Sequence, residues 1–364
     1  MSTLFSPFSL GKLALDNRII IAPMCQYSAD NGKTTHWHDM HLGNLAQSGA
    51  GLLIIEATAV APEGRITYGD VGLWDDETEA ALARTLTAIR SHSDMPIAIQ
   101  LAHAGRKASC EKPWDGGGAI DPDHANGWQI LAPSAVPFRD GDLIPESLTK
   151  AGIAEIVQAF VESAKRAVRL GLAAIEIHSA HGYLLHEFLS PHANKRDDDY
   201  GGSFENRTRI VFEVYDAIRD AVGADYPVGV RISASDWVAD GWDIDQSVAL
   251  AKGLKARDCD FIHVSSGGLH IDQKIPVGPN YQVPFAARIK AETGMTTIAV
   301  GLITEAEQAE AITFTGQADA IALARGILYD PRWPWHAAAT LGAEVKAAPQ
   351  YLRCQPRALK KLFG

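Results

Sequence analysis

The sequence has few cysteines, and none of them is paired in a short motif. Its 364 residues include only Cys25, Cys110, Cys259 and Cys354, and no two of these form a C-x-x-C pair. Zinc ribbons and iron–sulfur clusters need closely spaced thiolates, and small disulfide frameworks need more cysteines for their length. The sequence therefore predicts neither a thiolate metal centre nor a disulfide-stapled fold.

Long runs of one residue type are also missing. The net charge is -11, with 33 basic and 44 acidic residues, and no segment is rich in Lys or Arg. No apolar stretch approaches the length of a membrane span, and the first residues lack the basic and apolar regions of a secretion signal. We therefore expect a cytoplasmic protein that acts on small molecules and binds neither nucleic acid nor membranes.

Three histidines lie close together near the N-terminus. His36, His38 and His41 surround Trp37 in a segment that has the pattern of a helix start. A zinc site would need a further ligand at a nearby strand end, and the sequence offers none. We expect no metal site here.

Short β-rich runs alternate with segments long enough to hold a helix. These runs are 18–24, 51–57, 96–101, 173–178, 228–232, 261–264, 296–300 and 320–324. Eight such units predict an α/β fold in which 1–364 form one (β/α)8 TIM-barrel domain. Segment 148–170 places Ile153, Ile156 and Phe160 on one face, as expected for a helix that packs against the barrel.

Two segments depart from this regular pattern. The link 104–147, after the third strand, is far longer than a usual connection and contains the glycine-rich stretch 116–118, so it is predicted to be a surface loop. It could form a lid or contact a partner. The C-terminal extension after Gly342 has no second core to join, so it must pack on the barrel or reach a neighbouring subunit.

In a TIM barrel the chemistry lies at the carboxyl ends of the strands. The residues at these ends are polar or small, and they are Cys25, Tyr27, Ala57, Gln100, His103, His178, His181, Tyr183, Arg231, 265–268 (SSGG), Gly301, Arg325 and Gly326. The segment 178–183 is the most informative, because two imidazoles and a phenol can hold a carbonyl oxygen and deliver a proton. This combination suits the reduction or the enolisation of a carbonyl compound.

Other strand ends indicate a phosphorylated ligand. Glycine-containing turns follow the last two strands, and the second of them carries Arg325, as in barrels that bind phosphate. Gln100 and Arg231 could hold the polar edge of a heterocycle, which favours flavin mononucleotide (FMN). The residues alone leave two alternatives open: a lyase or isomerase of a phosphorylated substrate, and a flavin-binding redox sensor without turnover.

Several motifs follow one another in a specific order. They are Asn17 with Arg18, 22–27 (APMCQY), 56–60 (EATAV), 100–107 (QLAHAGRK), 178–183 (HSAHGY) and 186–191 (HEFLSP). In this order the chain resembles the Old Yellow Enzyme family of flavin-dependent ene-reductases, most closely its thermophilic-like and xenobiotic-reductase branch. The resemblance runs almost from end to end.

The resemblance implies an enzyme that reduces the C=C bond of α,β-unsaturated carbonyl compounds, and of some nitro compounds, with NADPH or NADH as reductant. His178 and His181 would bind the substrate oxygen, and Tyr183 would protonate the α-carbon opposite the face that receives hydride from the flavin N5. Tyr27 would also contact these activated alkenes. Arg353 would reach the active site of a neighbouring subunit in a homodimer or homotetramer.

The same resemblance assigns the residues that bind FMN without a covalent bond. They are Ala22, Pro23, Met24, Cys25, Ala57, Gln100, Arg231, Gly301, Ala324 and Arg325. Cys25 would tune the flavin potential, and Gln100 and Arg231 would hold the pyrimidine edge of the ring. Gly301, Ala324 and Arg325 would bind the phosphate.

Overall fold

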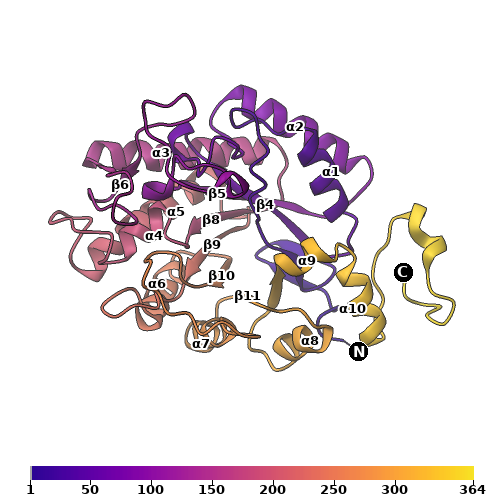
Figure 1. Cartoon of the computed structure of the whole chain (residues 1–364). Helices are drawn as coiled ribbons and strands as arrows, with labels where there is room; N and C mark the ends of the chain where they lie inside the picture. The colour runs from indigo at the N-terminus through magenta and orange to yellow at the C-terminus, as the bar shows by residue number, and fades with distance from the viewer. Residues whose placement is uncertain (1) are drawn as a thin grey trace.

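The chain folds around a closed barrel of parallel strands. In the computed structural model, which describes residues 2–364, the strands follow one another in the order β10-β11-β12-β3-β4-β5-β8-β9, and β9 pairs with β10 to close the ring (Figure 1). Their bounds are β3 (Ile19–Ile21), β4 (Leu52–Ala59), β5 (Ile97–Ala102), β8 (Ile175–Ser179), β9 (Val228–Ser233), β10 (Phe261–Ser265), β11 (Thr297–Val300) and β12 (Ala320–Leu323). The predicted TIM barrel is confirmed.

The first strand is shorter than predicted. It ends at Ile21, and the prediction that it continues to Met24 is wrong. The backbone N–H of Ala22 still donates to Leu323, but Pro23 has no N–H with which to extend the ladder. Residues after Ala22 therefore leave the barrel wall as irregular backbone at its carboxyl end.

Helices surround the barrel. The longer ones are α1 (His36–Leu45), α2 (Asp76–Arg90), α3 (Lys150–Arg169), α5 (Phe204–Val222), α6 (Ile244–Lys255), α7 (Val283–Thr293), α8 (Ala306–Phe314) and α10 (Trp333–Leu341), and the short ones are α4 (Leu184–Leu189) and α9 (Arg325–Tyr329). Helix α3 begins after Thr149, whose hydroxyl accepts a hydrogen bond from the N–H of Gly152, and it buries Ile153, Ile156 and Phe160 as predicted. Among the residues described, no helix is both long and apolar enough to cross a bilayer.

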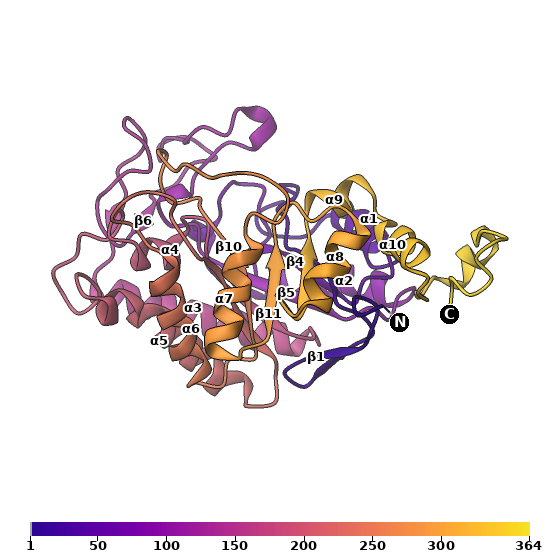
Figure 2. The same cartoon turned by 90° about the horizontal axis from the view of Figure 1, so that it is seen from below.

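An N-terminal hairpin covers the end of the barrel opposite the predicted site. Strands β1 (Phe8–Leu10) and β2 (Leu13–Leu15) pair antiparallel (Figure 2). Leu10 and Leu15 are buried in one cluster with Phe261 and other residues from the starts of the barrel strands. The sequence analysis missed this hairpin because its strands are only three residues long.

The long link after β5 is irregular, as predicted. Within residues 104–147 it contains only short elements, which are η2 (Gly105–Lys107), η3 (Pro113–Asp115), β6 (Leu131–Ala132) and β7 (Glu146–Ser147). A further short turn, η1 (Pro62–Gly64), follows β4. Figure 2 shows the long link 104–147 over one end of the barrel.

The C-terminal extension packs on α10 and stands out from the barrel (Figures 1 and 2). The ring of Trp335 lies 4.9 Å from that of Phe363 and 5.7 Å from that of Tyr351, measured between centroids. Arg353 lies in the short helix η4 (Pro349–Cys354) of this extension and is exposed. The extension therefore rests on the outer layer of helices.

The buried face of α3 makes a test of the packing. Phe160 is 0% exposed and Val168, on the same helix, is 39% exposed. We expect Phe160→Ala to lower the free energy of unfolding by about 3–5 kcal/mol, because it leaves a cavity between helix and barrel. Val168→Ala should change it by about 0.5 kcal/mol or less. Urea unfolding followed by circular dichroism measures both, and equal effects would contradict this packing.

Candidate active site

The carboxyl ends of neighbouring strands bring most of the predicted site residues together. His178 on β8 pairs in register with Arg231 on β9, and Arg231 pairs with His263 on β10. Gln100 on β5 stands beside Glu176 on β8. Cys25 and Tyr27 lie in the loop that leaves β3, and Ala57 lies on β4. The structure therefore gathers these residues at the mouth of the barrel.

A buried carboxylate that the sequence analysis missed holds one of these residues, Gln100, in place. Glu176 is 0% exposed; one of its oxygens accepts a hydrogen bond of 2.7 Å from Nε2 of Gln100, and the other lies 2.7 Å from Nδ1 of His263. Burial alone would raise the pKa of Glu176, but His263, Arg231 and Gln100 more than offset it and hold that pKa below its usual value. A charged residue in the middle of an apolar strand was the signal that could have revealed it.

The two predicted histidines and Tyr183 form one compact group. The ring of His178 lies 5.1 Å from that of His181 and 5.0 Å from that of Tyr183, both nearly perpendicular to it. Nε2 of His178 is 3.4 Å from Nδ1 of His181. The structure thus brings the two imidazoles and the phenol ring into one group, as the sequence predicted.

Close backbone contacts fix the turn that carries these side chains. His181 has a left-handed φ of 58°, and the N–H of His181 donates to the hydroxyl of Ser233 at 2.9 Å. A Cβ on Gly182 would lie 2.2 Å from the carbonyl oxygen of Gly268, so only glycine fits there. Lys107, from the long link, donates to the carbonyl oxygens of His181 at 2.8 Å and Gly268 at 3.0 Å.

Burial decides the protonation of the group. It lowers the pKa values of His178 and His181 well below that of ordinary histidine, and the positive charge of Arg231 adds to this effect. Burial also raises the pKa of Tyr183 well above that of a free phenol. At neutral pH the site therefore offers two neutral imidazoles, each with one N–H, and a phenol that keeps its proton.

A second buried acidic side chain, Glu56, supports the loop that carries Cys25 and Tyr27. Glu56 lies at an irregularity in the pairing of β4 with β5, and its Oε1 accepts a hydrogen bond of 2.9 Å from the backbone N–H of Gln26. Tyr27, the next residue, has a left-handed φ of 50°. Nε2 of His38 lies 3.7 Å from Oε2 of Glu56. Glu56, with His38 beside it, thus supports this strained loop.

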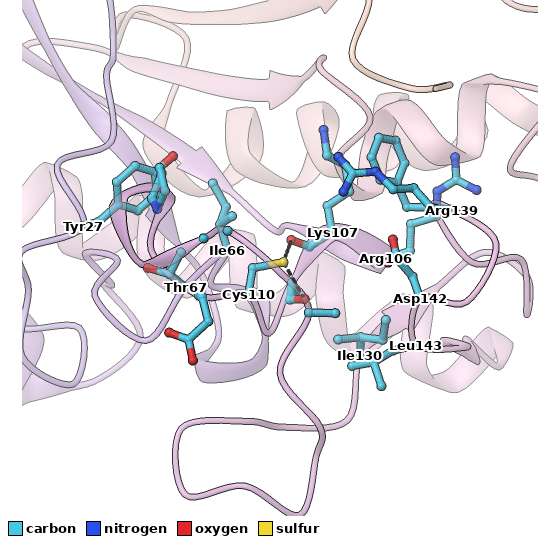
Figure 3. Close-up of a pocket in the computed structure, with 17 residues that line it drawn as sticks. Tyr27, Ile66, Thr67, Arg106, Lys107, Cys110, Ile130, Arg139, Asp142 and Leu143 are labelled. Atoms are coloured by element: carbon cyan, nitrogen blue, oxygen red, sulfur yellow. Dashed lines mark hydrogen bonds between the residues drawn. The ribbon is translucent and has the colours of Figure 1, made fainter. Parts of the chain in front are cut away.

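A cavity of about 340 Å³ opens beside Tyr27. Most of its wall comes from the long link, with Ala108, Ile130 and Leu143 as apolar contributors, and Ile66 adds to it from the segment after β4 (Figure 3). Lys107 also lines it, and the Nζ of Lys107 lies 5.0 Å from the centre of the Tyr183 ring. Of the predicted substrate residues, Tyr27 therefore lines this cavity, and Tyr183 lies close to it through Lys107.

The residues at the barrel mouth fit a flavin nucleotide. Arg231 is 7% exposed, and its Nε has no hydrogen-bond partner within the described residues, so its guanidinium is free to meet a polar ring edge. Gly301 has a φ of 125°, and a Cβ there would come within 2.7 Å of Nε2 of Gln282, which leaves bare backbone at the mouth. Ala324 and Arg325 stand at the start of α9, at the end of β12.

Two of the predicted strand-end and site residues have other positions or contacts than this group. Arg353 lies on the C-terminal extension, outside the barrel mouth of its own chain, so the structure does not bring it to the site. His103 is buried after β5, and its Nδ1 accepts a hydrogen bond from the N–H of Gly105, which gives it a part in the backbone turn. No group of His, Cys, Asp and Glu side chains among the described residues has the arrangement of a metal site.

The fold and this site define a class of protein: a TIM-barrel enzyme with a polar active site built for a flavin. A family model for the NADH:flavin oxidoreductase / NADH oxidase family matches residues 3–344. The chain belongs to this family, and the resemblance to the Old Yellow Enzyme family is confirmed. It is therefore an oxidoreductase that uses FMN and a nicotinamide reductant.

Individual relatives support the same assignment. The chain is 46% identical over 352 residues to the NADPH dehydrogenase of Geobacillus sp. (strain WCH70), an alignment that covers 96% of this chain and 98% of that protein. It is 43% identical over 363 residues to an NADH:flavin oxidoreductase of Gibberella zeae, in an alignment that covers 95% of this chain and 87% of that protein. Morphinone reductase shares its fold with a TM-score of 0.76 and 28% identity over 100% of this chain and 93% of that one.

The burial of Glu56 predicts a pH effect on stability. Burial raises the pKa of Glu56 from 4.5 to about 8, so the folded state holds this proton more tightly than the unfolded state does. The resulting stability is complete below about pH 4.5 and is lost as the pH rises through about 8. Glu56→Gln removes this loss of stability, which is on the order of a few kcal/mol. The stability of the variant relative to the wild type should therefore increase between about pH 5 and about pH 9.

Thermal unfolding midpoints across this pH range measure the difference. Burial also raises the pKa values of Asp70 and Glu187, but both residues are present in both proteins, so their contributions cancel in the difference between the two curves. Glu155→Gln, a change on the exposed face of α3, serves as the control and should follow the wild type. Parallel curves for Glu56→Gln and the wild type would contradict the assignment.

Proposed function

We propose that the protein is an ene-reductase that reduces the C=C bond of α,β-unsaturated carbonyl compounds and of some nitro compounds. One observation carries the proposal: the 3.4 Å approach of His178 Nε2 and His181 Nδ1, with the Tyr183 ring 5.0 Å from that of His178. Two neutral imidazoles can donate to one oxygen, and a protonated phenol beside them can act as an acid. Reduction of an activated alkene needs both.

His178 and His181 would hold the carbonyl or nitro oxygen and stabilise the negative charge that develops on it. FMN, when bound, supplies the hydride that reaches the β-carbon. Tyr183 would deliver its phenolic proton to the α-carbon, and its raised pKa keeps that proton in place at neutral pH until the enolate forms. Tyr27, at the edge of the cavity, would contact the rest of the substrate.

The residues proposed to hold FMN line the mouth from several strands. Gln100 and Arg231 would bind the pyrimidine edge, and the positive charge of Arg231 would offset negative charge on the ring. Ala22, Pro23 and Met24 would contact FMN through their backbone. Their position directly after β3, as irregular backbone, supports this assignment. The remaining members of this proposed set are Cys25, Ala57, Gly301, Ala324 and Arg325. Burial raises the pKa of Cys25, so it would act as a neutral thiol and not as a nucleophile.

We propose NADPH as the reductant, with NADH as the alternative. The Geobacillus relative is named an NADPH dehydrogenase, and morphinone reductase has been solved in complex with tetrahydroNAD. A lyase or isomerase of a phosphorylated substrate lies outside the family to which the chain belongs. The experiment below distinguishes the ene-reductase from a redox sensor without turnover.

We also propose a cytoplasmic location. It is supported by four free cysteines, as found in reducing compartments.

The proposed oligomer is a homodimer or homotetramer in which Arg353 reaches the active site of a neighbouring subunit. The exposed position of Arg353 on an extension that stands out from the barrel supports this role. Arg353→Ala should then raise the KM for an enone about 10-fold, as expected for the loss of a charged contact, and leave the sedimentation coefficient unchanged. Sedimentation that finds only monomer in the wild type would remove this role.

The proposed activity is tested with a visible spectrum and two additions. The purified protein should show flavin absorption that bleaches with anaerobic NADPH and returns when 2-cyclohexenone is added. In Tyr183→Phe, bleaching should persist, but the return should slow by about 10²–10⁴-fold, the usual contribution of a general acid.

Tyr329→Phe is the control for this pair of experiments, because Tyr329 is 93% exposed on α9. It should behave as the wild type does. A bleached wild-type protein that 2-cyclohexenone does not reoxidise would favour the redox sensor, and an unchanged rate in Tyr183→Phe would refute the proton-donor role.

A further inference from the structure

The turn that carries His181 and Tyr183 is held at both ends of one peptide unit. This unit joins His181 to Gly182; its carbonyl oxygen accepts a hydrogen bond of 2.8 Å from Nζ of Lys107, and its N–H donates to Nδ1 of His186 at 2.9 Å. His186 lies on α4 and is 0% exposed. It is not among the residues proposed to contact substrate or FMN.

The turn needs such contacts because its backbone is strained. His181 has a φ of 58° and Gly182 one of 75°, and the N–H of Tyr183 donates to the carbonyl oxygen of Ala180 at 3.2 Å. Positive φ values at both central residues are typical of a type I′ turn, which a residue with a Cβ, such as His181, adopts only at an energetic cost. Contacts to the peptide between them help to keep this shape, and with it the directions of the rings of His181 and Tyr183.

The contact with Gly182 also shows which nitrogen of His186 carries the proton. A ring nitrogen that accepts a hydrogen bond from a backbone N–H has no proton, so the ring proton of His186 lies on Nε2. Nε2 is 2.9 Å from Oδ1 of Asp236, which lies in the loop after β9 and is also 0% exposed. A carboxylate oxygen can only accept, so it matches an N–H at Nε2 and would repel a lone pair there.

The other oxygen of Asp236 is occupied by two donors. Oδ2 accepts a hydrogen bond of 2.6 Å from the hydroxyl of Ser190 and one of 2.8 Å from the backbone N–H of Trp242. Burial alone would raise the pKa of Asp236, but the contacts with His186, Ser190 and Trp242 more than offset it and hold that pKa below its usual value. Asp236 therefore faces His186 as an ionised carboxylate at neutral pH.

We infer that Asp236 is a positioning residue that keeps the proton of His186 on Nε2, so that Nδ1 of His186 can hold the peptide between His181 and Gly182. Through this chain a carboxylate outside the proposed binding residues sets the directions of the proposed hydrogen-bond donor His181 and the proposed acid Tyr183. The inference rests on the proposed function and deepens it, since it says what keeps these groups in the geometry that proton delivery needs.

Asp236→Asn is a sharp test because the structure dictates how the new amide must lie. The backbone N–H of Trp242 needs an acceptor, so the amide oxygen takes the place of Oδ2 and the NH₂ group faces Nε2 of His186. His186 could accept from this NH₂ group only if its proton moved to Nδ1, where it would face the N–H of Gly182. One of the two contacts of His186 is therefore lost, and the turn is held less firmly.

Two further variants separate this effect from a general loosening. Ser190→Ala is the matched control, because it removes a hydrogen bond from Oδ2 of Asp236 but leaves the carboxylate oxygen that faces His186. In His186→Asn an amide oxygen can accept from the N–H of Gly182, and no ring tautomer remains for Asp236 to set. Circular dichroism and the FMN content of each protein show whether a variant has lost its fold or its cofactor.

The first readout is the tautomer of His186. Proteins labelled with ¹⁵N-histidine are compared by two-bond ¹⁵N–¹H correlation spectra, and the His186 signals are identified by their loss in His186→Asn. We expect the Nε2–H tautomer in the wild type and in Ser190→Ala, and a shift toward Nδ1–H in Asp236→Asn. An Nδ1–H tautomer in the wild type, or no change in Asp236→Asn, would overturn the inference.

The second readout is the rate at which 2-cyclohexenone reoxidises the reduced flavin, measured in H₂O and in D₂O. Asp236→Asn should lower this rate about 10- to 100-fold, as expected when catalytic groups are misplaced. The solvent isotope effect should rise, because proton delivery by Tyr183 then limits the rate more strongly. Ser190→Ala should resemble the wild type in both respects. An unchanged rate, or a lower rate with an unchanged isotope effect, would refute the positioning role.

The double variant completes the test. In the His186→Asn background, Asp236→Asn should slow reoxidation little further, because its effect passes through the ring of His186. Equal losses in both backgrounds would contradict this route. If the wild type does not reduce 2-cyclohexenone at all, the proposed function fails, and the spectra still decide whether Asp236 sets the tautomer of His186.

Discussion

The arrangement at the barrel mouth depends on one ionised carboxylate inside the barrel. A buried charge is tolerated only when its partners satisfy it, and Glu176 has them on both sides: Gln100 from β5 and His263 from β10, with the positive charge of Arg231 nearby. These contacts tie together strands that are far apart in the chain. They also fix the orientation of the Gln100 amide that we assign to the flavin. Loss of Glu176 would leave Arg231 and His263 as unbalanced polar groups in the core.

The same burial that isolates this charge prepares the chemistry above it. It keeps His178 and His181 uncharged and Tyr183 protonated, which is the protonation that the proposed roles as hydrogen-bond donors and acid require at neutral pH. Uncharged rings also avoid repulsion with Arg231, which stands beside His178 in the strand register. A site made of neutral donors next to one fixed positive charge is suited to a reaction in which negative charge appears for a short time on an oxygen.

The barrel and most of the site could be predicted from the sequence, and the reasons are local. Apolar runs that alternate with helical segments identify the strands, and a TIM barrel places their ends in one pocket. The hairpin at Phe8–Leu10 and Leu13–Leu15 was missed because three-residue strands carry almost no periodicity. The charge of Glu176 in an apolar strand could have marked it as a site residue, but its partners and those of Glu56 could not be predicted, because they depend on which residues of different segments stand side by side. The position of Arg353 relative to a second subunit depends on contacts between chains.

The wall of the cavity beside Tyr27 comes mostly from one continuous segment, while the charged network comes from the barrel strands. The two parts therefore share few residues. Substitutions, insertions or deletions within 108–147, beyond the Lys107 contact to the turn of His181, can reshape the cavity while the strands that hold Glu176 and the histidines stay as they are. In evolutionary terms, the choice of substrate and the chemistry performed on it can diverge separately, so descendants of one ancestral barrel can acquire new substrates without rebuilding the reaction.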